Sequence, residues 1–256
     1  LQIYSTLQPF QSQGPLTLTL LYDDVDLSGY SGDYGVPKVV PYDDYLFVTR
    51  GAGLKSTLPL RFEPEVDVLD RSNLRKLTQY ESSTWDYEIH NGYAYAFYGF
   101  GSHLFRNPLR VYDISDPLDP KRLATRDGEY RNLLIDDHWV YVFHAMNWGD
   151  NKQGQLSILD PMTLEEIAIL EDVGKGVAIR GRLLYADRGG KLSIYDVADV
   201  EDIRLIGSTA VPSEEWGSLN EGMFVGDYLS NPANAHGVRI FDVSDPTNLR
   251  QVASYD

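Results

Sequence analysis

The first long polar stretch of the sequence has a residue spacing similar to the opening of a calcium-binding loop. Asp24, Asp26 and Ser28 place side-chain oxygens at alternate positions, and Gly29 follows where such a loop turns sharply. The sequence differs from a calcium loop at the twelfth position, where Gly35 stands in place of a bidentate glutamate. Ordinary solvated loops use the same residue types. The pattern therefore predicts either a calcium site formed by Asp24, Asp26 and Ser28 or a plain loop.

Three histidines, His103, His144 and His236, lie on or beside long polar segments in different parts of the chain. Imidazoles that converge on one point can bind zinc or another transition metal. Their spacing includes no close pair of the kind found in many zinc sites. A metal role for them therefore depends on the fold bringing them together.

The strands that must position these residues are predicted by a recurring sequence phrase of alternating apolar residues that ends in aspartate. Its copies are residues 66–70 (VDVLD), 109–113 (LRVYD), 156–160 (LSILD), 192–196 (LSIYD) and 238–242 (VRIFD), and a sixth copy, 1–4 (LQIY), has Ser5 in the aspartate position. Repeats of this length indicate a unit that buries its apolar face by stacking on copies of itself.

Each repeat is predicted to form four short strands. In one copy these are residues 87–89, 93–97, 109–112 and 121–125, with Asn91 and Gly92 in a tight turn. Radially stacked four-stranded units form a β-propeller. We therefore predict an all-β, six-bladed β-propeller spanning residues 1–256 as one domain. The predicted blades are a partial blade at 1–21 and full blades at 36–80, 84–125, 130–171, 174–208 and 219–254.

The repeated aspartates are predicted to be structural. Asp113, Asp196 and Asp242 each end a strand, where a short carboxylate can accept hydrogen bonds from backbone N–H groups two or three residues further on. A second aspartate follows three residues later in each turn, and Pro117 and Pro246 then favour reversal of the chain.

Residues 113–117 (DISDP), 196–199 (DVAD) and 237–246 (GVRIFDVSDP) resemble the LVIVD-repeat family of propellers. The resemblance covers nearly the whole chain, although the turns after Asp70 and Asp160 are shorter. It implies a bacterial or archaeal protein that is exported or attached to a cell surface. It concerns the scaffold, so it assigns no functional residue.

The first predicted blade lacks its two inner strands. Residues 1–20 supply a third and fourth strand, with no first and second strand before them. An incomplete ring exposes strand edges, which proteins avoid. We expect the missing strands to lie upstream of Leu1, or to come from a partner chain that completes the blade.

The long insertions are predicted to gather at one face of the propeller. They are residues 22–36, 51–59, 99–108, 144–154, 209–218 and 230–237. Insertions confined to one face of a repeat scaffold usually build its binding surface. Aromatic and polar side chains there are the predicted contacts for a protein or glycan ligand: Tyr30, Tyr34, Phe105, Arg106, Trp148, Trp216 and His236.

Basic residues at the entrances of the innermost strands are a second candidate group. Lys38, Arg131 and Lys175 could form a basic well for a carboxylate or phosphate at the mouth of the central channel. The alternative is a structural ion network in which Asp86 and Glu221 pair with them.

Charge and composition exclude several classes of protein. A net charge of −16 argues against nucleic acid and against anionic membranes. The absence of cysteine excludes disulfides and thiolate chemistry. No apolar run is long enough for direct membrane insertion. Phosphate-loop, dinucleotide and nucleophile-elbow patterns are also missing from the sequence.

Three functions remain open on the sequence alone. The favoured interpretation is a non-catalytic binding or scaffold module, extracellular or at the cell surface, that recognises a protein or glycan through its long loops. The alternatives are a metal-dependent hydrolase or lyase at the channel mouth and a structural subunit of a larger assembly.

Overall fold

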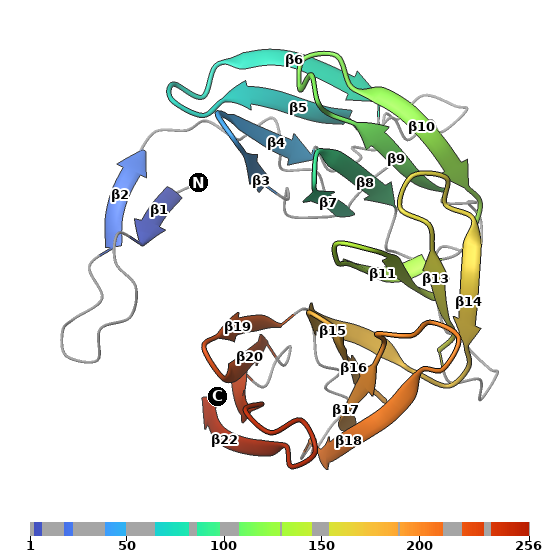
Figure 1. The fold of residues 1–256 in the computed structure, drawn as a ribbon. Coiled ribbons are helices and arrows are strands. Elements are labelled where there is room, and N and C mark those ends of the chain that lie inside the picture. Colours follow the sequence, from blue (N-terminus) through green and yellow to red (C-terminus); the bar gives the residue numbers. More distant parts are fainter. Residues whose placement is uncertain are drawn as a thin grey trace, which may run out of the picture. The chain divides into compact units, whose positions relative to one another are not determined.

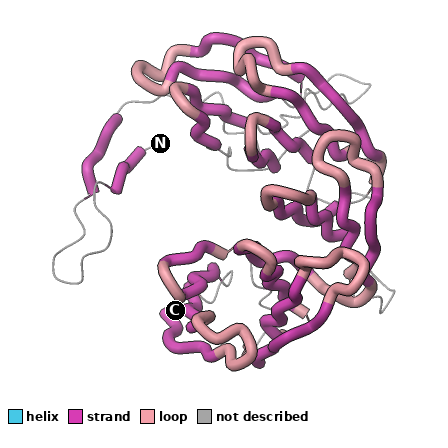
Figure 2. The backbone as a smooth tube through the Cα atoms, in the orientation of Figure 1, coloured by secondary structure: helices cyan, strands magenta, loops and turns pink. Residues whose placement is uncertain are grey.

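The computed structural model describes residues 3–6, 18–22, 39–49, 65–81, 86–97, 108–128, 130–144, 154–188, 190–211, 222–232 and 237–255. These described residues form strands and turns without any helix (Figures 1 and 2). They build five four-stranded antiparallel sheets and one two-stranded sheet. The predicted all-β class is confirmed. The chain divides into two compact units, Leu1–Tyr87 and Glu88–Asp256.

The first unit contains the two-stranded sheet and one four-stranded sheet. Its strands are β1 (Ile3–Thr6), β2 (Leu18–Tyr22), β3 (Val39–Tyr42), β4 (Tyr45–Thr49), β5 (Glu65–Asp70) and β6 (Lys76–Glu81). Strands β1 and β2 pair with each other, and β3 to β6 follow one another in sequence order. Leu46, Val48 and Leu69 form an apolar cluster on the larger sheet, with Val39 and Leu74 packed against it.

The second unit holds four sheets, each made of four consecutive strands. The first two sheets are β7 (Asp86–His90, which begins just before the unit boundary), β8 (Tyr93–Phe97), β9 (Leu109–Asp113) and β10 (Lys121–Arg126), then β11 (Tyr130–Ile135), β12 (Val140–His144), β13 (Leu156–Leu159) and β14 (Glu166–Leu170). The last two sheets are β15 (Lys175–Arg180), β16 (Leu183–Asp187), β17 (Lys191–Asp196) and β18 (Arg204–Ala210), then β19 (Met223–Val225), β20 (Tyr228–Pro232), β21 (Val238–Asp242) and β22 (Arg250–Tyr255).

Strand β12 shows how these four sheets stack. Its alternate residues belong to two different apolar clusters, because successive side chains of a strand point to opposite faces of the sheet. Val140 and Val142 pack with residues of the preceding sheet, such as Tyr95. Tyr141 and Phe143 pack with residues of the following sheet. Each middle sheet is therefore covered on both faces, which explains why its central strands are apolar at nearly every position.

The first hairpin of the second unit has the turn that its sequence predicts. Asn91 and Gly92 both have positive φ angles, 48° and 79°. A two-residue turn of this kind matches the twist of the flanking strands, and asparagine followed by glycine is the preferred pair for it.

Two kinds of connection lie at opposite ends of each four-stranded sheet. Tyr93, the first residue of β8, pairs with Asp113, the last residue of β9. The β7–β8 hairpin and the β9–β10 turn therefore share one end of the sheet, here named the turn end. The β8–β9 connection, residues 98–108, leaves from the other end, here named the segment end. Tyr45 with Asp70 and Tyr228 with Asp242 repeat this relationship.

Candidate binding site

The repeated aspartates organise the turn end. Asp113 accepts a hydrogen bond from the backbone N–H of Ser115 at 2.8 Å, and Asp242 accepts one from Ser244 at 3.1 Å. The hydrogen bonds from Ser115 hold the pKa of Asp113 below its usual value, and those from Ser244 do the same for Asp242. The structural role predicted for these residues is confirmed.

The second aspartate of each turn makes the same kind of contact. Asp116 accepts from the backbone N–H of Leu118 at 3.0 Å, and Asp199 accepts from Glu201 at 3.0 Å. Asp245 accepts from both the N–H and the hydroxyl of Thr247, which lowers its pKa. These carboxylates close turns a few residues long.

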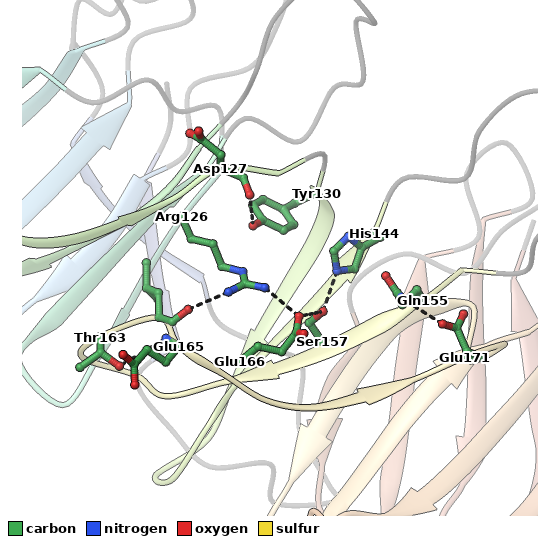
Figure 3. Close-up of polar contacts among 11 residues, drawn as sticks. Arg126, Asp127, Tyr130, His144, Gln155, Ser157, Thr163, Glu165, Glu166 and Glu171 are labelled. Carbon is green, nitrogen blue, oxygen red and sulfur yellow. Dashed lines mark hydrogen bonds and ion pairs between the residues drawn. The ribbon is translucent and has the colours of Figure 1, made fainter.

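A polar network joins two neighbouring sheets of the second unit (Figure 3). Arg126 of β10 donates a 2.7 Å hydrogen bond to Glu166 of β14 and a 3.3 Å one to the carbonyl of Leu164. The Ser157 hydroxyl donates to the same Glu166 oxygen at 2.9 Å, and His144 Nε2 lies 2.8 Å from Ser157 Oγ. The network thus extends from β10 to the last residue of β12.

The order of groups in this network is different from that of a hydrolytic triad. In a triad the carboxylate binds the histidine, which in turn binds the nucleophilic serine. Here Ser157 stands between Glu166 and His144, and it is 1% exposed. A substrate therefore cannot reach its hydroxyl, and the arrangement serves to hold two sheets together.

The proton positions in the network follow from the contacts. Ser157 has one hydroxyl proton and gives it to Glu166, so His144 Nε2 carries a proton that it donates to Ser157. Burial lowers the pKa of His144. Its ring also meets the edge of Tyr130, with the ring centres 5.4 Å apart.

Ser157 occupies a position that sequence reasoning overlooked. It is the second residue of the recurring phrase, and the corresponding residues of the other copies are Asp67, Arg110, Ser193 and Arg239. Asp67 is fully buried and pairs with Lys76 at 2.8 Å, and the Arg239 guanidinium lies 3.5 Å from Gln251. A polar residue inside an otherwise apolar phrase was the available signal, because a buried polar group needs a partner.

Most residues predicted to bind a ligand lie outside the described part of the chain. These are Tyr30, Tyr34, Lys38, Phe105, Arg106, Trp148, Trp216 and His236, together with His103, Glu221 and the calcium candidates Asp24, Asp26 and Ser28. Arg131 is the second residue of β11, and Lys175 is the first residue of β15 and half-buried. Their ligand roles stay predictions, as does the calcium site.

A central cavity runs between the first strands of the four sheets in the second unit. Its volume is about 240 Å³. It is lined mainly by apolar residues of β11 and β15, with Glu88 and His90 from β7 and Phe224 from β19. The Arg180 guanidinium lies 4.1 Å from the centre of the Phe224 ring, which links β15 to β19.

Two negative findings apply only to the described residues. Among them no group of three or more histidine and carboxylate side chains is placed to hold a metal ion. None of their elements is a helix of the length and hydrophobicity that a membrane crossing requires.

Several solved structures have a similar fold. BamB from Moraxella catarrhalis matches with 11% identity and a TM-score of 0.54, over 82% of this chain and 57% of the BamB chain. KlAtg21, solved in complex with the coiled coil of AgAtg16, matches with 13% identity and a TM-score of 0.57, over 82% and 68% of the two chains. A chain of the mitotic checkpoint complex matches with 12% identity and a TM-score of 0.59, over 93% and 68%.

The fold is that of a β-propeller. The chain spans 57% of BamB and 60% of the computationally designed protein Ika8, so it is shorter than the propellers that it resembles. No protein-family model matches the sequence. No curated protein matches it either.

Proposed function

We propose that this chain is a protein-binding propeller module that acts as a scaffold. The observation that carries the proposal is the stacking of four blade-like sheets. The buried polar residues of their strands hold neighbouring sheets together. Two similar structures are complexes by their own description, KlAtg21 with a coiled coil and the mitotic checkpoint complex. A propeller of this kind presents its connections as an adaptable surface on a rigid support.

The segment end is the proposed binding surface. At the turn end the aspartates are engaged in closing the turns, whereas the connections at residues 98–108 and 145–155 of the second unit are long and carry aromatic and basic side chains. Phe105, Arg106 and Trp148 belong to the residue types that dominate binding energy at protein interfaces. Membership of the LVIVD-repeat family and a position at the cell surface belong to the same proposal and rest on the repeat residues.

The test is a selection of peptide ligands on the immobilised chain, followed by affinity measurements in solution. A segment variant carries Phe105→Ala, Arg106→Ala and Trp148→Ala. A turn variant carries Leu118→Ala, Met162→Ala and Glu201→Ala, which are exposed in turns at the other end. We expect the segment variant to lose about tenfold or more in affinity, as for loss of a central interface residue, and the turn variant to bind normally.

Three results would contradict the proposal. The first is a selection that yields no ligand. The second is a set of ligands whose affinity falls in the turn variant but not in the segment variant. The third is a hydrolase or lyase activity that is abolished by His103→Ala or His236→Ala. A parallel glycan array tests the ligand class. A glycan whose binding falls in the segment variant and not in the turn variant would show that the partner is a carbohydrate instead of a protein.

A further inference from the structure

A second cavity lies at the turn end of the second unit. Its volume is about 610 Å³, within the range of pockets that hold small ligands or side chains. Hairpin turns of three consecutive sheets surround it: His90 precedes the first turn, Asp136 to Trp139 form the second, and Gly181 and Arg182 form the third. His90 also lines the central cavity, as do Ile135 and Ile179. We call the second cavity the turn-end pocket, and these three residues are walls that it shares with the central cavity.

One carboxylate of this pocket is held in place from the neighbouring sheet. Asp137 Oδ1 lies 3.0 Å from His90 Nε2 and accepts a 3.2 Å hydrogen bond from Asn91 Nδ2. The Asp137 side chain is nevertheless 75% exposed. Among the described residues both of these contacts reach Oδ1, so Oδ2 is the oxygen that can meet a ligand. The hydrogen bonds from Asn91 and His90 also lower the pKa of Asp137, which keeps it ionised.

The charges around the pocket favour a cation. Asp136 and Asp137 are two lining carboxylates, and Arg182 is the one lining guanidinium. Asp196 lies 3.4 Å from that guanidinium and offsets its charge. Asp136, Asp137 and Asp196 therefore outnumber the one guanidinium here, in a protein whose formal net charge is −16. A cation would be attracted to this site from a distance.

The rest of the lining fits a side chain that is apolar along its length. Ile135, Ile179 and Val197 line the pocket beside the charged groups. Trp139 is half-buried, packs on the apolar cluster between the second and third sheets of the unit, and also lines the pocket. An indole ring attracts cations to its face, and guanidinium stacks on it well because the group is planar and weakly hydrated.

We propose that the turn-end pocket binds an arginine side chain of a basic peptide segment, with the guanidinium between Asp137 and Trp139 and the methylene groups on Ile135 and Ile179. This is a second binding site, at the end of the sheets opposite to the segment end. It takes its specificity from an aspartate that a neighbouring sheet positions.

The test measures binding of capped hexapeptides of alternating glycine with arginine, lysine or glutamate to the full chain by calorimetry at low salt. The arginine peptide should bind more tightly than the lysine peptide, and the glutamate peptide should not bind. Asp137→Asn keeps an oxygen for His90 and Asn91 but removes the charge. It should weaken arginine binding roughly fivefold, the effect of losing one exposed ion pair.

Matched variants separate this site from general attraction to an acidic protein. Glu201→Gln removes one exposed charge from the turn end outside the pocket and should leave the affinity within about twofold. Trp139→Phe should weaken arginine binding, and Arg182→Gln should strengthen it. Equal effects of Asp137→Asn and Glu201→Gln would overturn the proposal. Absence of arginine binding, or preferential binding of the glutamate peptide that Arg182→Gln abolishes, would also overturn it.

Discussion

Arg126 and Glu166 form a 2.7 Å ion pair that connects the outer strand of one sheet to the outer strand of the next. The two side chains are only 30% and 29% exposed. Glu166 is also held by Ser157, so the pair is anchored in the interior of the second sheet. The contact therefore adds a directional, charge-paired link between adjacent blades to the non-directional apolar packing between them.

Replacing Arg126 of this ion pair should destabilise the second unit. Arg126→Gln leaves the partly buried Glu166 without its charged partner, and we expect the free energy of unfolding to fall by about 1–3 kcal/mol. Denaturant unfolding followed by fluorescence measures it. Lys121→Gln breaks the exposed Lys121–Asp119 pair and should cost less than about 1 kcal/mol. Equal losses for the two variants would contradict an anchoring role.

The stability of the protein should decrease in mildly acidic solution because of His144. Burial lowers its pKa in the folded state, so the unfolded chain takes up a proton at higher pH than the folded chain does. The contribution to stability is present above the unfolded pKa of about 6.5 and is lost as the pH falls toward and through the lower folded pKa. Melting temperatures between pH 7.5 and 5 measure this loss.

His144→Gln should flatten that pH profile, because glutamine can donate to Ser157 without titrating. His138→Gln is the matched control, since His138 is exposed in a hairpin turn. Its profile should follow that of the wild type. A His144→Gln profile as steep as the wild type would show that another group carries the pH dependence.

The turn aspartates should make the fold sensitive to stronger acid. The pKa values of Asp113, Asp242 and Asp245 are lowered by hydrogen bonds from their turns. Their stabilising effect is present above the unfolded aspartate pKa of about 3.9 and is lost as the pH falls through the folded values. Circular dichroism from pH 5 to pH 2 should show the unfolding, and Asp242→Asn should make the loss less steep. An unchanged slope would contradict this origin.

A methyl group on Gly207 should disturb the contact between the last two sheets. A Cβ built there would lie 2.1 Å from the carbonyl oxygen of Pro246, a backbone atom in the turn after β21. We expect Gly207→Ala to lower the free energy of unfolding by about 1–3 kcal/mol, as overpacking does. Leu205→Ala on the same strand changes a side chain that is 53% exposed and should cost about 0.5 kcal/mol or less. Similar values for the two variants would contradict this packing.

Much of the fold could be predicted from local sequence patterns. The alternating apolar residues of each phrase predict strands, and Asn91 with Gly92 predicts the hairpin, because both depend on residues close in sequence. The same holds for Asp113, whose partner Ser115 is two positions away. The ligand residues proposed from the long segments lie outside the described residues, so those predictions stand as they were.

What the sequence determined by itself was the sheet unit and its turns, since a strand, a hairpin and an aspartate-capped turn are each fixed by neighbours along the chain. Stacking of the sheets decided the rest. Arg126 meets Glu166 across 40 positions and His90 meets Asp137 across 47. Such contacts form only when apolar faces bury each other and bring the polar edges of separate sheets together, and no local pattern specifies which side chains then meet.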